Sequence, residues 1–239
     1  MRLLAVETST LTGAVALLDG GAVVAESRVS VAITHGERLV SAIDGVLRAA
    51  RRELADIDAF AVAIGPGSFT GLRIGLSTIK GLAFATGKPA VGVPTLDALA
   101  SRLPYCAYPI CPILDARKNE VYTGLYRTLT GRLEVLEAPR AMPPGALAEE
   151  LRDGPGGPVV LVGDAVGRFG PIFSEILGAR ACLAPPDLRL PSAVTVGEMA
   201  TEALGRGETG DPGNLVPLYV RPSEAELARE RRQSAGRPN

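Results

Sequence analysis

One pattern recurs in both halves of this sequence and limits how the chain can fold. Residues 2–6 form an apolar run that predicts a buried strand, a polar turn follows at 7–10, and an apolar strand pattern resumes at 14–18. The same succession of strand, polar turn and strand begins again at residue 110, 108 residues further along the chain. A chain that opens both halves in this way is predicted to form two related lobes, each built on its own sheet.

Strand and helix patterns alternate through the rest of the chain, which indicates α/β architecture. Strands are predicted at 22–29, 58–64, 89–93, 121–127 and 159–162, helices at 35–52, 72–86, 95–102 and 194–204, and surface loops at 139–145 and 154–158. Two such lobes with opening hairpins are typical of the actin-like, sugar-kinase-like (ASKHA, ribonuclease H-like) fold, with mixed sheets flanked by helices. We expect a first lobe at 1–103 joined by 205–221, a second lobe at 104–204, and a charged tail at 222–239.

Composition excludes several classes of protein. Apolar residues make up 46% of the chain, which excludes disorder, while a net charge of −1 and 4% aromatic residues argue against a dedicated nucleic-acid binder. A single histidine, His35, and three cysteines without a CxxC pair leave no zinc ligand set, so no metal site is predicted. The longest fully apolar run, residues 59–64, is too short for a membrane helix, and no secretory signal is visible, so we expect a cytoplasmic protein.

The predicted helix at 72–86 follows the glycine-rich segment Gly65–Gly71, which is neither a P-loop nor a G-x-G-x-x-G motif. This helix is apolar on more than one side, so both sides need cover. Gly75 and Gly81 interrupt it, at a cost of about 1 kcal/mol each relative to alanine, which suggests that another backbone comes close. Two interpretations stay open: a partner subunit covers the second apolar side, or the neighbouring helix at 35–52 does.

The opening turns carry carboxylates where an ATP-using protein of this fold would hold magnesium, Glu7 in the first turn and Asp115 in the second. Thr8 and the pair Gly163-Asp164, which resembles an adenosine-covering loop, complete a candidate nucleotide site. We interpret this site as vestigial, because Glu7 is one methylene longer than the aspartate normally placed in that turn. The alternative is a stand-alone actin-like ATPase or kinase that uses Glu7 and Asp115.

Several strings in the chain resemble one known family. They are Glu7-Thr-Ser-Thr10, His35-x-Glu37, the run from Ala63 to Gly75, Gly81-Leu-Ala83, the run from Val91 to Leu96, the run from Leu114 to Tyr122, and Pro217-Leu-Tyr-Val-Arg221. In this order they are similar to the TsaB (YeaZ) family over nearly the whole chain. The resemblance implies an actin-like two-lobed fold and a part in making the threonylcarbamoyladenosine that lies next to the anticodon of tRNA.

The resemblance also implies partners. In that system a TsaD subunit carries the metal and transfers the threonylcarbamoyl group, and a TsaE ATPase joins the complex. This chain, with His35 as its one histidine, lacks the paired metal-binding histidines of TsaD. It is therefore expected to be a non-catalytic scaffold with no cofactor of its own, with ADP or ATP held at a subunit interface and tRNA contacted only indirectly. A homodimer is the expected alternative in isolation.

Members of this family pair through two helices of the first lobe, so the resemblance implies an interface on the helices at 35–52 and 71–86. The residues predicted to form it are His35, Leu39, Ile43, Val46, Phe69, Leu72, Arg73, Gly75, Leu76, Ile79 and Ala83.

Overall fold

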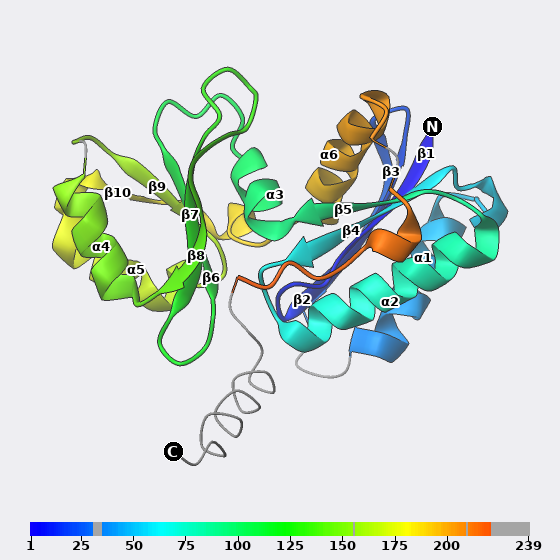
Figure 1. The fold of residues 1–239 in the computed structure, drawn as a ribbon, viewed down its shortest axis with the longest axis horizontal. Helices are drawn as coiled ribbons and strands as arrows, with labels where there is room; N and C mark the ends of the chain where they lie inside the picture. The colour runs from blue at the N-terminus through cyan, green and yellow to red at the C-terminus, as the bar shows by residue number, and fades with distance from the viewer. Residues whose placement is uncertain (31–34, 155, 209, 221–239) are drawn as a thin grey trace, which may run out of the picture.

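The computed structural model describes residues 1–30, 35–154, 156–208 and 210–220, and the side chains of 29–30 and 35–37 lie outside this description. These residues form two lobes, each with a five-stranded sheet (Figure 1). The first sheet contains β1 (Arg2–Glu7), β2 (Thr12–Asp19), β3 (Ala22–Ser30), β4 (Ala59–Gly65) and β5 (Ala90–Pro94), in the order β3-β2-β1-β4-β5. The second contains β6 (Ile110–Asp115), β7 (Val121–Arg127), β8 (Glu134–Met142), β9 (Val159–Val162) and β10 (Ala181–Leu183), in the order β10-β9-β6-β7-β8.

The two sheets repeat one topology. In the first sheet, β1 pairs antiparallel with β2 and parallel with β4. In the second sheet, β6 pairs antiparallel with β7 and parallel with β9. The repeated opening pattern of the sequence therefore corresponds to two related mixed sheets, as predicted.

Helices cover both faces of each sheet. Helices α1 (His35–Ala49) and α2 (Phe69–Thr86) cover one face of the first sheet, and α6 (Ala193–Gly205) covers the other. Helices α4 (Pro144–Asp153) and α5 (Val166–Leu177) cover the outer face of the second sheet, and α3 (Thr95–Ser101) lies on its inner face. Figure 1 shows α3 and α6 next to each other between the sheets. Within the described residues, no helix has the length and apolar character that crossing a bilayer requires.

The apolar run of β1 is buried on both sides because β1 is the central strand of its sheet. Leu4 and Val6 pack with α1 and α2, while Leu3 and Ala5 pack with α6. Successive side chains of a strand point to opposite faces. Glu7 continues the series of Leu3 and Ala5, so it lies on the α6 side, which faces the other lobe.

The chain returns to the first lobe earlier than expected. Residues 193–204, predicted to belong to the second lobe, form α6 and pack on the first sheet. A Cβ placed at Gly197 would lie 2.5 Å from the Leu18 side chain, so α6 and β2 approach closely. Helical periodicity predicted α6 but says nothing about which sheet the helix covers. The predicted tail at 222–239 lies outside the described residues.

Residues 139–145, predicted to be a surface loop, contain the end of β8 and the start of α4. Pro139 fits in β8 because this is the edge strand of its sheet. Pro144 takes the first turn of α4, where the missing N–H has no helical partner to lose. Helix α5 was not predicted, because Pro171 inside it is a strong helix breaker in sequence.

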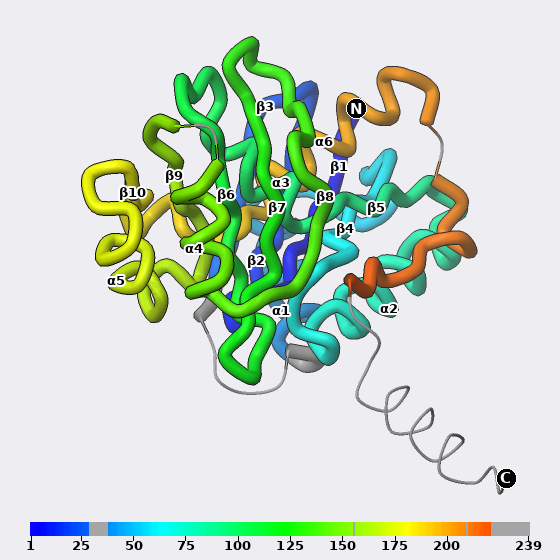
Figure 2. Tube along the Cα trace, turned by 60° about the vertical axis from the view of Figure 1, so that its left-hand side comes forward, coloured from blue at the N-terminus to red at the C-terminus, as the bar shows by residue number. Residues whose placement is uncertain are grey.

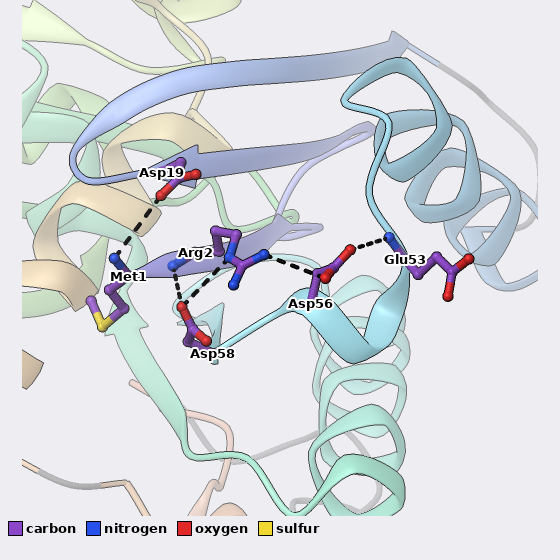
Figure 3. Close-up of polar contacts among 6 residues, drawn as sticks. All are labelled: Met1, Arg2, Asp19, Glu53, Asp56 and Asp58. Carbon is purple, nitrogen blue, oxygen red and sulfur yellow. Dashed lines mark hydrogen bonds and ion pairs between the residues drawn. The ribbon is translucent and has the colours of Figure 1, made fainter.

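Exposed ion pairs define where β1 begins beside β4 (Figure 3). The backbone N of Arg2 donates to Asp58 Oδ2 at 2.7 Å, and the Arg2 guanidinium lies 3.4 Å from Asp56 Oδ1. The backbone hydrogen bond from Arg2 lowers the pKa of Asp58. Glu53 N in turn donates to Asp56 Oδ2 at 2.9 Å. Exposed pairs of this kind add little stability, so their main effect is to position the start of the sheet.

Glycines allow α2 to pack directly on the turn after β1. A Cβ at Gly71 would lie 2.0 Å from Thr8 O, and one at Gly75 would lie 2.3 Å from Thr8 Oγ1. Thr8 Oγ1 donates a hydrogen bond of 2.8 Å to Gly71 O. Further along α2, a Cβ at Gly81 would have no described atom within 4 Å. The lobe therefore requires glycine at positions 71 and 75, whereas Gly81 has no packing role within the described chain.

Alanine substitutions at Gly75 and Gly81 should therefore change stability in opposite directions. Gly81→Ala removes backbone freedom in open space and should raise the free energy of unfolding by about 0.5–1 kcal/mol. Gly75→Ala pushes Thr8 away from the helix and should lower it by about 1–3 kcal/mol. Urea denaturation of the purified variants, followed by circular dichroism, measures both changes. A Gly75→Ala variant as stable as the unmodified chain would contradict the close packing.

Candidate functional site

The candidate nucleotide site is centred on a carboxyl group enclosed by protein. Glu7, at the end of β1, is 1% exposed. Its Oε1 accepts a hydrogen bond from Ser9 N at 2.7 Å, while its Oε2 is buried without a hydrogen-bond partner among the described residues. The hydroxyl of Ser9 is also buried and unpaired within that part of the chain. An ionised carboxylate is costly in such surroundings.

In the second lobe Asp164, which follows β9, is the carboxyl group that interacts electrostatically with Glu7. Asp164 Oδ1 accepts a hydrogen bond from Asp115 N at 3.1 Å. Gly163 has a φ of 132°, and a Cβ there would lie 2.0 Å from Ile113 O. Gly163 thus allows the turn to approach β6, and Asp164 holds the end of β6. The adenosine-covering role expected for this pair stays a prediction.

Burial is the main cause of the raised pKa values of Glu7 and Asp164. It raises the pKa of Glu7 to about 7; the hydroxyl and the backbone N–H of Ser9 next to the carboxyl oppose this effect, and the nearby Asp164 adds to it. Burial also raises the pKa of Asp164, with a smaller contribution from Asp115. Carboxyl groups from the two lobes therefore lie near each other in a place where the loss of their protons is unfavourable.

Asp115 continues the side of β6 that faces α5, and Arg168 of α5 holds its turn in place. Arg168 Nη1 lies 3.5 Å from Asp115 Oδ2, and Arg168 Nη2 donates to Asn119 Oδ1 at 2.8 Å. Arg117, Lys118 and Asn119 all have positive φ, an uncommon conformation for such residues that needs support from their surroundings. Sequence reasoning missed Arg168 because it lies on a helix that was not predicted. The sequence gives one local indication of a role for Arg168, which is its position four residues, or about one helical turn, after Asp164.

These residues do not fit a bound magnesium nucleotide. Thr8 is hydrogen-bonded to α2, Asp115 is paired with Arg168, and Glu7 is buried. Magnesium sites use ionised carboxylates and retain several waters, which the enclosed first turn does not offer. Among the described residues, no group of three or more His, Cys, Asp or Glu side chains is placed to hold a metal ion. The arrangement therefore disfavours the alternative of an ATPase or kinase that uses Glu7 and Asp115.

Most of the predicted interface residues instead lie inside their own lobe. The buried ones are Leu39, Ile43, Val46, Leu72, Gly75, Leu76, Ile79 and Ala83. They are enclosed while the lobe is folded and cannot meet a second subunit, so this part of the prediction is wrong. The cause is general: the strongest apolar stripe of a surface helix faces its own sheet. Phe69 and Arg73 are exposed, and the side chain of His35, the first residue of α1, lies outside the described part.

The opposite side of these two helices forms an exposed surface that we call the outer face. It contains Val40, Gly45 and Arg48 of α1, and Phe69, Arg73, Ser77, Gly81, Phe84 and Ala85 of α2. Phe84 is 64% exposed and Val40 is 60% exposed. Of the two interpretations of α2, the structure shows the neighbouring helix α1 beside it, and cover by a partner subunit stays a prediction. Helix α1 lies beside α2 on the sheet, Tyr219 stacks on Phe69 at one end of the outer face, and the outer-face side chains further along α2 are exposed.

Comparison with known proteins identifies the family. The family model of TsaD, tRNA N6-adenosine threonylcarbamoyltransferase, matches residues 27–163. The tRNA threonylcarbamoyladenosine biosynthesis protein TsaB of Bacillus subtilis is 31% identical over 226 residues, which cover 95% of this chain and 96% of that protein. This chain belongs to the TsaB (YeaZ) family.

Solved structures agree with membership of the TsaB family. A Pseudomonas aeruginosa protein described as similar to peptidase YeaZ aligns with a TM-score of 0.77 and 29% identity, covering 92% of this chain and 99% of its own. Component A of the (R)-2-hydroxyglutaryl-CoA dehydratase of Acidaminococcus fermentans shares the fold alone, with a TM-score of 0.55 and 12% identity. The predicted family and the predicted actin-like fold are therefore both confirmed.

The pH dependence of stability should reveal the buried carboxyl of this TsaB-family chain. The folded pKa of Glu7, about 7, lies above its ordinary value of 4.5. Its stabilising contribution is therefore complete below pH 4.5 and is lost as the pH rises through about 7, a change of about 3 kcal/mol. Glu7→Gln keeps the acceptor for Ser9 N but does not ionise, so this part of the pH dependence should disappear.

Thermal unfolding at about pH 5 and about pH 8 measures the effect. Glu175→Gln, a neutralisation on the exposed side of α5, is the matched control and should leave the pH dependence unchanged. If Glu7→Gln loses as much stability at high pH as the unmodified chain, the carboxyl of Glu7 is solvated and the assignment is wrong.

Proposed function

We propose that this chain is a non-catalytic, cytoplasmic subunit in the biosynthesis of threonylcarbamoyladenosine in tRNA. In this proposal it pairs with a TsaD-type transferase subunit through the outer face of α1 and α2. Family membership supports the pathway, since the Bacillus subtilis relative is named as a biosynthesis protein of that modified nucleoside. The observation that carries the proposal is the outer face itself, an exposed surface that combines small residues, apolar side chains and two arginines.

The outer face is suited to close contact with another helix. The exposed side of α2 presents Ser77, Gly81 and Ala85, and α1 adds Gly45. Neither glycine would have a described atom within 4 Å of an added Cβ, so both leave open space above the helices. The distance between packed helices depends on the size of the side chains at the contact, and small ones allow a short distance.

The buried carboxyls support a scaffold role. A residue that binds or polarises a substrate must reach it, whereas Glu7 is enclosed and Asp115 is paired with Arg168. The partner then supplies the chemistry, and this chain brings no cofactor of its own. We further propose that a TsaE-type ATPase joins the pair, that ADP or ATP is held at a subunit interface, and that tRNA is contacted through the partners. In isolation, the same outer face would pair two copies of this chain.

A large charged side chain at the centre of the outer face should prevent pairing. Gly81→Arg places a guanidinium where the partner backbone comes close, and an unpaired charge in such a contact is costly. Co-purification with the TsaD-type subunit should be lost, while the free chain keeps its circular dichroism spectrum. Ser174→Arg, at an exposed position on α5, is the matched control and should co-purify normally. A Gly81→Arg variant that still binds would show that the interface lies elsewhere.

Activity should need the partner. The purified chain alone should neither hydrolyse ATP nor transfer a threonylcarbamoyl group, because its candidate acidic residues are buried or ion-paired. Adding the chain to the TsaD-type subunit with threonylcarbamoyl-adenylate and tRNA should raise transfer, measured by nucleoside analysis of the tRNA. ATP turnover by the chain alone that disappears in Glu7→Gln would instead support the ATPase or kinase alternative.

A further inference from the structure

A segment near the end of the described chain, residues 210–220, runs along the first lobe beside α2. We call it the strap, and it is the orange-red segment next to α2 in Figures 1 and 2. It begins at β5, where Ala90 N donates to Gly210 O at 3.2 Å. Lys80 Nζ of α2 donates to Leu215 O at 3.0 Å and to Gly213 O at 3.3 Å. The strap is thus bound to both β5 and α2.

The end of the strap is fitted closely to β4. Leu218 N donates to Ile64 O at 2.7 Å. A Cβ at Gly65 would lie 2.7 Å from Leu218 O, so glycine is needed for this approach. Leu215 packs against the core cluster between the sheet and α2. The strap therefore forms a fixed part of the surface of the first lobe.

The strap ends in an aromatic and cationic stack at the start of α2. The ring of Tyr219 stacks on that of Phe69, with centroids 5.3 Å apart. The Arg73 guanidinium lies 3.8 Å from the centroid of Phe69, and Arg73 Nε donates to Tyr219 Oη at 3.3 Å. These contacts hold the guanidinium in one position. Its two terminal nitrogens make no hydrogen bond with the described residues.

Apolar side chains surround this stack at the surface. Val216 is 64% exposed, Tyr219 is 37% exposed, and Leu218 and Phe69 are each 36% exposed. Together with Arg73 they form what we call the strap patch. Aromatic residues and arginine next to exposed aliphatic side chains are the composition of the residues that contribute most to binding in protein interfaces.

The strap patch is continuous with the outer face of α2. Phe69 and Arg73 belong to both surfaces, and the small residues Ser77 and Gly81 follow along the helix. Phe84 lies at the other end, about 22 Å from Phe69 at the rise of an α-helix. Large apolar groups thus flank a shallow stretch of small ones, which suits a partner helix laid along α2 with a larger contact at the strap.

We infer that the strap patch is a second part of the surface that binds the transferase-type partner. It receives an apolar segment of that partner carrying a carboxylate, which pairs with the terminal nitrogens of Arg73. The inference rests on the proposed function and adds to it an interface region from the C-terminal part of the chain.

Titration calorimetry of the chain with the TsaD-type subunit tests this inference. Val216→Arg changes an exposed side chain outside the stack and should weaken binding at least tenfold with an unchanged unfolding temperature. Arg73→Gln should weaken binding several-fold and reduce its dependence on salt, because an ion pair is lost. Tyr219→Phe keeps the stack but loses the hydrogen bond that orients Arg73, so it should weaken binding less than Arg73→Gln does. Ser174→Arg on α5 is the control for an added surface charge.

The outcomes separate the inference from the proposed function. Normal binding by Val216→Arg and Arg73→Gln, with loss of binding by Gly81→Arg, overturns the strap patch and leaves the proposed function intact. Normal binding by Gly81→Arg overturns the proposed interface on α2. Sedimentation of the isolated chain covers one further case: if Val216→Arg separates a homodimer but binds the partner normally, the patch serves a second copy and the inference is wrong.

Discussion

The contact between α2 and the turn after β1 determines both the buried and the exposed surfaces of the first lobe. Gly71 and Gly75 bring the helix backbone against Thr8, and Thr8 returns a hydrogen bond to Gly71. This contact covers the turn on the α2 side, while Glu7, at the end of β1, is buried on the α6 side, where burial raises its pKa. The contact also fixes the rotation of α2 about its axis, because the side that carries these glycines must face the turn. The opposite side, with Gly81, is left exposed.

The two lobes share a topology but use their opening turns differently. In the first lobe α2 covers the turn, and Thr8 is bound to that helix. In the second lobe the turn is exposed in part, and Arg168 holds it through Asp115 and Asn119. Gly163 and Asp164 join the end of β9 to β6. Both lobes thus keep the duplicated backbone of the actin-like fold, while the polar side chains of their opening turns take part in intramolecular contacts.

Hydrophobic periodicity predicted the helix α2 but not which of its sides is buried. A helix with one apolar stripe has one buried side, but α2 is apolar on several sides, so its sequence is compatible with more than one orientation. The predicted stripe through Leu76 and Ile79 is the one that faces the sheet. The side available to a partner carries small and mixed residues, which periodicity does not distinguish from ordinary solvent-exposed positions.

The sequence by itself determined the local elements, the duplicated opening of the two lobes and the family, because strand patterns, turn residues and motifs act over a few neighbouring residues. Only the tertiary structure decided which sheet α6 covers, which side of α2 is buried, and that Glu7 lies near Asp164. It also placed Tyr219 on Phe69, far from it in the chain. These outcomes depend on close packing between distant segments, where side-chain volume and the access of water are set by neighbours that no local pattern specifies.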